Sequence, residues 1–208
     1  MAGRFITLEG GEGAGKSTQA RLLAAALRGA GHAVRLTREP GGAPGAEQLR
    51  DLLLHGTEGF VAEAETLLHF AARAEHLART VRPALAGGEW VVCDRFADST
   101  MAYQGYGHGV DRGMIATLTA MMGTVPDLTL VLDVSAAVAA RRRAGRAGAA
   151  DRYEALDEAF HARVRAGFRA IAAADPARCA RIDADPDPAS VQAAIRVAVS
   201  ARWPEAMG

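Results

Sequence analysis

Residues 5–18 read FITLEGGEGAGKST and indicate how this 208-residue chain folds. Residues 10–17 fit the phosphate-loop pattern G-x-x-x-x-G-K-[ST], in which glycines let the backbone wrap an anion and the lysine reaches the β and γ phosphates. Residues 5–8 form an apolar run suited to a buried strand, and apolar residues at helical spacing follow the loop as far as Gly29 and Gly31. This order predicts a nucleoside triphosphate site at the start of a helix, whose free N–H groups face the phosphates.

Lys16 is the only lysine, whereas the other twenty-three basic residues are arginine. The chain therefore favours arginine except at the one position where a compact ammonium on a flexible stem is needed. We predict that the loop holds the phosphates of ATP. Its residues are Gly10, Gly11, Glu12, Gly13, Ala14, Gly15, Lys16, Ser17 and Thr18.

The amino-acid composition argues against several classes of function. Twenty-four acidic residues balance twenty-four basic ones, which argues against bulk binding of nucleic acid or of an anionic membrane. No apolar run approaches the roughly eighteen residues of a membrane span, and no signal-peptide pattern is present. Cys93 and Cys179 do not form a C-x-x-C pair, so we expect buried, inert thiols in a reducing cytoplasm. The histidines have no metal-ligand spacing.

Apolar strand-like runs alternate with helical patterns along the whole chain. The runs lie at 4–9, 33–37, 89–94, 128–133 and 178–183. Helical patterns occupy roughly 16–29, 45–55, 62–86, 111–122, 134–143, 153–174 and 187–200. This alternation predicts an α/β fold in which helices cover both faces of a parallel sheet. Polar residues end the first four runs, where open parallel sheets bind their ligands.

Two polar clusters follow predicted strands. Residues 38–42 read REPGG, and residues 94–105 read DRFADSTMAYQG. Asp94 is placed to assist Mg²⁺ beside the loop hydroxyl of Ser17, and Arg95 can fork onto phosphate oxygens. The alternatives are a turn with a surface arginine for the first cluster, and a helix cap or an ion-pair partner for the aspartate of the second.

A third cluster lies on a predicted helix, and a fourth segment interrupts the regular order. In LLHFAAR, residues 67–73, Arg73 shares a helical face with His69 and Phe70, and an aromatic ring beside a guanidinium can grip a planar base. A core phenylalanine with a surface arginine fits the same spacing. Residues 144–151, AGRAGAAD, suit a mobile flap and a plain exposed loop equally well.

Together these segments resemble the thymidylate kinase family, phosphate-loop enzymes that phosphorylate dTMP. The resemblance covers nearly the whole chain and implies a three-layer P-loop nucleoside monophosphate kinase-like fold with a five-stranded parallel sheet. It implies a single kinase domain over residues 1–208, with a flexible lid at about 144–152. The implied reaction is phosphoryl transfer from ATP to dTMP, with Mg²⁺, in a cytoplasmic homodimer, as a step in dTTP synthesis. The implied partners are ATP and dTMP, without nucleic acid or membrane.

The resemblance also implies residue roles. Lys16, Arg95 and the lid arginine Arg146 would be catalytic, and Ser17 and Asp94 would serve the metal. Glu12 would meet the sugar 3′-hydroxyl, and Tyr103 would crowd the 2′ position. The dTMP-binding residues would be Glu12, Arg38, His69, Phe70, Arg73, Arg95, Ser99, Thr100, Tyr103 and Gln104. The family usually has phenylalanine at the position of His69, so either His69 or Phe70 stacks on thymine.

The implied chemistry needs no general base, because the acceptor phosphate is already an anion at pH 7. Two other functions share the phosphate loop. One is another small kinase, which would act on a deoxynucleoside, another nucleoside monophosphate or the hydroxyl group of a metabolite. A hydroxyl acceptor would normally need a carboxylate base, and assays with thymidine and with dTMP separate these kinases from the implied reaction. A nucleotide-dependent switch or partitioning ATPase is the other class. A guanine-reading N-K-x-D segment is excluded, because the single lysine lies in the loop.

Overall fold

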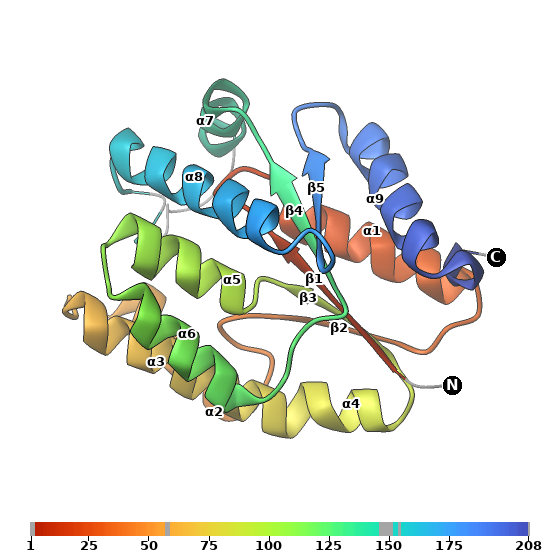
Figure 1. Ribbon diagram of the computed structural model, residues 1–208, viewed down its shortest axis with the longest axis horizontal. Coiled ribbons are helices and arrows are strands. Elements are labelled where there is room, and N and C mark those ends of the chain that lie inside the picture. The colour runs from red at the N-terminus through yellow and green to blue at the C-terminus, as the bar shows by residue number, and fades with distance from the viewer. Residues whose placement is uncertain (1–2, 57–58, 146–151, 154, 208) are drawn as a thin grey trace.

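The computed structural model describes residues 3–56, 59–145, 152–153, 155–207. At its centre is a five-stranded sheet with the strand order β2-β3-β1-β4-β5 (Figure 1). All pairings are parallel, which confirms the predicted fold class. The strands are β1 (Arg4–Glu9), β2 (Val34–Arg38), β3 (Trp90–Asp94), β4 (Leu128–Asp133) and β5 (Cys179–Asp183).

Helices fill the intervals between the strands, largely as predicted. They are α1 (Lys16–Gly29), α2 (Pro44–His55), α3 (Ala62–His76), α4 (Arg82–Ala86), α5 (Ala97–Thr100), α6 (Arg112–Met122), α7 (Ala136–Ala144), α8 (Glu158–Ala174) and α9 (Pro188–Arg202). Two π-helical segments, η1 (Leu77–Val81) and η2 (Met101–Gly107), continue α3 and α5, and a short 3₁₀ helix, η3 (Pro204–Met207), follows α9. Within the described residues, no helix is long and apolar enough to cross a bilayer.

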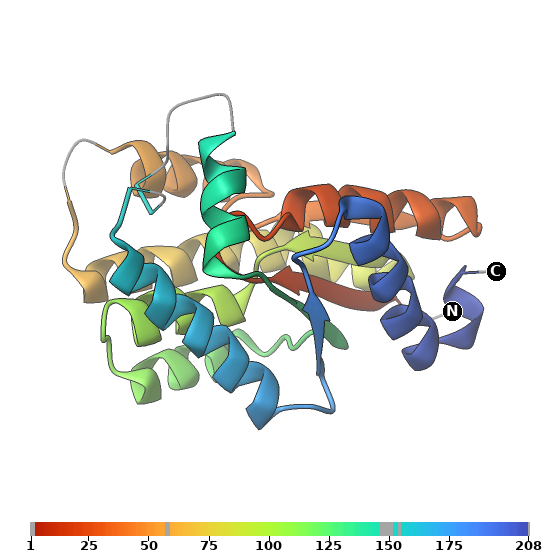
Figure 2. The ribbon, with the colours of Figure 1, turned by 90° about the horizontal axis from the view of Figure 1, so that it is seen from above.

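Successive side chains of each strand point to opposite faces of the sheet, and helices bury both faces. On β1, Ile6 and Leu8 pack into a cluster with residues of α1 and α9. Phe5 points to the opposite face, where it packs with residues of η1, α4 and α5. Further along that face, Val131 of β4 packs against α8. Figure 2 shows the resulting layers, with α1 and α9 on one side of the sheet and α8 on the other. The sheet is therefore covered on both sides, as three layers require.

The continuous helix formed by α5 and η2 was not predicted from the sequence. Its glycines lower helix propensity, but they allow close packing. A Cβ atom on Gly107 would lie 2.6 Å from a ring carbon of Phe160 in α8, and one on Gly105 would lie 3.3 Å from Ile115 in α6. The segment is helical because neighbouring helices hold it, and Tyr103 and Gln104 are buried in its π-helical turns.

The two cysteines lie in different strands of the sheet. Cys93 belongs to β3, next to the central strand β1, and Cys179 belongs to the edge strand β5. Both thiols are free and buried, as expected. Burial raises the pKa of Cys93 well above its usual value and that of Cys179 to about 11. Both side chains are therefore neutral packing groups at pH 7.

Candidate active site

The phosphate loop joins the central strand β1 to α1, as the sequence predicts. Gly13 and Gly15 have left-handed φ angles of 77° and 88°, which favour glycine. A Cβ atom on Gly13 would lie 2.7 Å from the carbonyl oxygen of Ala139 in α7, so the loop can approach that helix only without a side chain. The loop therefore brings backbone N–H groups to the start of α1, where an anion is favoured.

Lys16 is buried in the loop and holds it closed. Its Nζ donates a hydrogen bond to the carbonyl oxygen of Gly11 at 2.9 Å. Burial and then the charge of Arg95 lower the pKa of Lys16 to about 8. The ammonium is therefore poorly compensated in the free protein, and polyphosphate oxygens would supply the missing negative charge.

Ser17 and Asp94 meet where α1 begins and β3 ends. Ser17 Oγ donates a hydrogen bond to Asp94 Oδ2, because β1 and β3 are paired and their carboxyl ends lie together. Oxygen ligands of this kind suit Mg²⁺, which usually keeps several waters and binds few protein groups. Within the described residues, no cluster of three or more histidine, cysteine or acidic side chains could hold a metal by itself.

Arg95, Glu12 and Tyr103 form a compact charged group beside the loop. Arg95 has a left-handed φ of 70°, and its Nη1 donates to the carbonyl oxygen of Gly10, directly after β1, at 3.2 Å. Its Nη2 pairs with Glu12 Oε1 and donates to the Tyr103 hydroxyl at 3.1 Å, and that hydroxyl donates to Glu12 Oε1 at 2.7 Å. Burial opposes the charge of Arg95, but Glu12, Tyr103, Asp94 and Glu9 together outweigh burial and raise its pKa. Arg95 is therefore a permanent cation.

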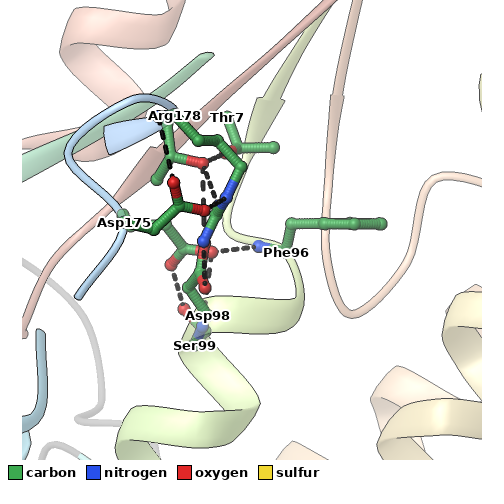
Figure 3. A network of polar contacts seen from close by, with 8 residues as sticks. Thr7, Phe96, Asp98, Ser99, Asp175 and Arg178 are labelled. Atoms are coloured by element: carbon green, nitrogen blue, oxygen red, sulfur yellow. Dashed lines mark hydrogen bonds and ion pairs between the residues drawn. The ribbon is translucent and has the colours of Figure 1, made fainter. Parts of the chain in front are cut away.

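A buried carboxylate behind the loop holds this arginine in place. Glu9 ends β1, and its Oε1 accepts from the backbone N–H of Phe96 at 2.8 Å (Figure 3). Its Oε2 accepts from Ser99 Oγ at 2.5 Å, and Ser99 Oγ accepts from Arg95 Nη1 at 3.2 Å. Burial and then the charge of Asp98 raise the pKa of Glu9 to about 7.

The same network reaches the far strands of the sheet. Asp98 of α5 pairs with Arg178 at 2.6 Å, and Arg178 Nη1 also donates to Thr129 Oγ1 of β4 at 2.7 Å. Asp175 accepts from Arg178 Nε at 2.9 Å (Figure 3). These contacts anchor α5 to β4 and to the turn before β5. The helix that carries Ser99 and Thr100 is thus fixed on the sheet.

Arg73 of α3 reaches the same cavity from the other side. The side chain is 3% exposed, and Nε donates to Glu39 Oε2 at 2.8 Å while Nη2 donates to Thr100 Oγ1 at 3.0 Å. The guanidinium lies 4.8 Å from the ring centre of Phe70. Its Nη1 is buried and has no hydrogen-bond partner within the described part of the chain. A buried donor of this kind is costly unless a ligand pairs with it.

The structure separates the two rings that the sequence could not distinguish. Neighbouring helical residues point about 100° apart, so only one of them can face the cavity. His69 lines the cavity, whereas Phe70 packs in the core with Val110 and Ile115. His69 Nε2 is hydrogen-bonded to Tyr153 Oη at 2.9 Å. Burial and then the charge of Arg73 lower the pKa of His69 to about 3, so the imidazole is neutral at pH 7.

Arg38 lies at the entrance, at the end of β2. Its side chain is 54% exposed and pairs with Glu47 at 3.1 Å. It lines the cavity, and its side chain has no hydrogen bond or ion pair with another predicted site residue in the described structure, so it must leave Glu47 to reach a phosphate.

One cavity of about 220 Å³ brings most of the predicted side chains together. They are Glu12, Lys16, Ser17, Arg38, His69, Arg73, Asp94, Arg95, Ser99, Thr100, Tyr103 and Gln104. Arg146 lies outside the described residues. Among the other arginines near the predicted lid, Arg143 is 3.7 Å from Glu158, and Arg152 pairs with Glu65 at 2.9 Å.

Four residues that hold the site in place were not predicted from the sequence. Glu9, Glu39, Glu65 and Tyr153 each hold a predicted site residue, and three of them are buried acids. Glu39 lies inside the REPGG motif and Glu9 directly precedes the loop, so position was the only available signal. Their partners are distant in sequence, which spacing does not indicate.

Known proteins that are similar to this chain over most of its length are thymidylate kinases. A family model described as thymidylate kinase matches residues 8–195. The chain is 57% identical over 207 residues to the thymidylate kinase of Gluconobacter oxydans, covering 96% of both chains. It is 53% identical to that of Caulobacter vibrioides, covering 93% of this chain and 94% of the relative. The crystal structure of thymidylate kinase from Ehrlichia chaffeensis superimposes with a TM-score of 0.79 at 37% identity, covering 96% and 99% of the two chains.

Proposed function

The chain belongs to the thymidylate kinase family and transfers a phosphoryl group from ATP to dTMP, giving ADP and dTDP, and we propose that the cavity described above is where this happens. One observation carries the assignment of the site. Arg73 lines the same cavity as the phosphate loop, and its buried donor Nη1 has no partner in the described structure. A phosphate cradle and an unpaired base-reading donor in one cavity suit a nucleoside monophosphate beside a triphosphate.

We propose that Lys16, Arg95 and Arg146 stabilise the transferring group. Because dTMP already carries an anionic oxygen near pH 7, the protein needs only to align two polyanions and neutralise their charge. Lys16 would exchange the Gly11 carbonyl for the β and γ phosphates of ATP. Arg95, held by Ser99 and Glu9, would receive the phosphate of dTMP together with Arg38. This division explains why arginines, rather than a catalytic base, gather in the cavity.

Mg²⁺ fits the corner between α1 and β3. Ser17 would bind it directly and Asp94 through water, since their oxygens already lie in contact. Bound there, Mg²⁺ would neutralise charge on the β and γ phosphates. Ser17 and Asp94 would keep this corner oriented.

We propose that the nucleoside of dTMP lies between Glu12 and Arg73. Glu12 accepts hydrogen bonds from Arg95 and Tyr103 in the free protein, and it would accept one from the 3′-hydroxyl of the sugar. Arg73 Nη1 would donate to the 4-carbonyl of thymine, and the neutral ring of His69 would cover the base. Tyr103 would stand next to the 2′ position and disfavour ribonucleotides.

A panel of monophosphates in a coupled ADP-release assay tests the site. We expect dTMP to be the best substrate and dUMP to be weaker, because the missing methyl group is worth about 1 kcal/mol of apolar burial. We expect dCMP and purine monophosphates to be far poorer, because they leave Arg73 facing an amine or do not fit. A preference for dCMP or AMP, or turnover of thymidine itself, would contradict the assignment.

We also propose that the chain forms a homodimer. The helices α2, α3 and α6 pack side by side, at the lower left of Figure 1, and carry exposed apolar side chains. Leu52 is 43% exposed, Leu67 is 50% exposed and Met121 is 71% exposed. Sedimentation should give a dimer, and Leu67→Glu should dissociate it. Val197→Glu on α9, where the native side chain is also 71% exposed, is the matched control that should remain dimeric.

We further propose a cytoplasmic location, which the two free buried thiols support. Disulfide-free chains with buried cysteines are usual in reducing compartments. Fractionation of cells that produce the protein would test this.

A further inference from the structure

Glu65 is a buried acid that no part of the proposed chemistry uses. It lies on α3, two turns before Arg73, and is 1% exposed. Its Oε1 accepts from Gln104 Nε2 at 2.9 Å and from the Tyr153 hydroxyl at 2.7 Å. Its Oε2 pairs with Arg152 at 2.9 Å. The carboxylate therefore joins three segments at the wall of the cavity: α3, η2 and residues 152–153.

The carboxylate determines which way the Gln104 amide points. An ionised carboxylate only accepts hydrogen bonds, so the NH₂ group of Gln104 must face it. The same Nε2 also donates to the Tyr153 hydroxyl at 3.2 Å, and that hydroxyl gives its own proton to Glu65. Rotation of the amide by 180° would place its carbonyl oxygen against the carboxylate. The reversed orientation is therefore excluded by repulsion between acceptors.

The fixed amide leaves its carbonyl oxygen free for a ligand. Gln104 lines the cavity, and within the described part of the chain no group donates to its Oε1. Thr100, the other residue that the sequence suggested as an acceptor, already receives Arg73 Nη2 at 3.0 Å. Gln104 Oε1 is thus the acceptor that the cavity lining offers in addition to the unpaired donor of Arg73. This pattern complements a base with a carbonyl next to a ring N–H group.

We propose that Glu65 is a specificity-determining positioning residue, which locks the amide of Gln104 so that the site accepts a pyrimidine with a proton on N3. Thymine and uracil have this proton, whereas cytosine has a bare acceptor at N3. Glu65 touches no substrate itself and acts through Gln104. The inference rests on the proposed dTMP site.

Glu65→Gln tests the inference at nearly constant size. A glutamine at this position can accept from or donate to Gln104, so the amide of Gln104 becomes free to turn its NH₂ group toward the base. Leaving a buried polar group unpaired costs about 1–3 kcal/mol, so the ratio of kcat/KM for dTMP to that for dCMP should fall about tenfold or more. We expect kcat/KM for dTMP to fall and that for dCMP to rise.

Two further variants separate selectivity from general damage. Glu63→Gln makes the same change at an exposed position two residues earlier on α3, and it should leave the ratio unchanged. Gln104→Met removes the amide, so it should lower the ratio by itself, and Glu65→Gln should then lower it no further. Thermal denaturation shows which variants are folded. If Glu65→Gln does not fold, Gln104→Met remains the test: a lowered ratio supports selection through the Gln104 amide that Glu65 holds, and an unchanged ratio overturns the inference.

The possible failures are distinguishable. If the unmodified protein does not prefer dTMP to dCMP, the proposed base site is wrong. If it does prefer dTMP, and folded Glu65→Gln changes the ratio by less than about twofold, only the role of Glu65 is wrong. A twofold change is smaller than the change expected from one unpaired buried group.

Discussion

Glu9→Gln should change how the stability of the protein depends on pH. An unperturbed glutamate has a pKa of 4.5, whereas burial and the charge of Asp98 raise the pKa of folded Glu9 to about 7. Between these pH values the folded protein keeps a proton that the unfolded chain has released. The carboxyl group therefore favours folding below pH 4.5, and this contribution is lost as the pH rises through 7.

The size of the effect follows from these two pKa values. At 1.36 kcal/mol per pH unit, the interval from 4.5 to 7 corresponds to about 3 kcal/mol. Glutamine does not titrate, and its amide can keep one acceptor for Phe96 N–H and one donor for Ser99 Oγ. The free energy of unfolding of Glu9→Gln, relative to the unmodified protein, should therefore rise by about 3 kcal/mol between acidic pH and about pH 8.

Urea denaturation of both proteins, across pH values from about 5 to 8, measures this difference. The other titrating groups are common to the two proteins, and among them Lys16 also responds to the charge of Glu9. Glu158→Gln is a useful control, because its hydrogen bond to Arg165 lowers the pKa of that exposed carboxyl. Its stability difference should move in the opposite direction and stay small, since solvent screens the pair. A Glu9→Gln difference that does not change with pH, or that falls as pH rises, would refute the reasoning.

Three further predictions concern individual side chains. An amine-reactive reagent near pH 8 should modify Lys16, whose pKa is about 8, and abolish turnover unless MgATP protects it; full activity after proven modification would contradict its role. Arg146→Ala should lower kcat by on the order of 10³-fold with dTMP affinity nearly unchanged, and normal turnover would move the role to Arg143 or Arg152. Arg73→Met should destabilise the protein by about 3–5 kcal/mol, because it leaves the buried Glu39 without its arginine. In urea denaturation the loss should be clearly smaller when Glu39→Gln is already present, and additivity would argue against the pair.

The sheet and the phosphate loop were predictable because their signals are local. Runs of apolar residues marked all five strands to within about a residue, and the loop pattern identified its own strand and helix. The start of α8 was placed too early. The side chain of Asp157 accepts from Phe160 N–H at 2.7 Å, so the helix begins after that cap, at Glu158, rather than at 153.

The candidate site was predicted in its residues but not in its connections. Glu39, Glu65 and Glu9 are fully or almost fully buried, although acidic side chains usually lie at the surface. Each is tolerated because a partner from a distant segment pairs with it, such as Arg73, which is 34 positions from Glu39. Local pattern contains no information about such pairs. For the same reason, the sequence could not show whether His69 or Phe70 faces the cavity, because this depends on how α3 packs against its neighbours.

The two buried thiols can report local opening of the sheet. A thiol reagent cannot reach Cys93 or Cys179 until the strand that carries it detaches, and both groups must then ionise outside the fold. Cys179 in the edge strand β5 reports fraying at one margin of the sheet, whereas Cys93 in β3 reports opening beside the strand that carries the phosphate loop. Their alkylation rates, compared with and without nucleotide, would show whether ligand binding protects only the strand beside β1 or also the edge strand β5.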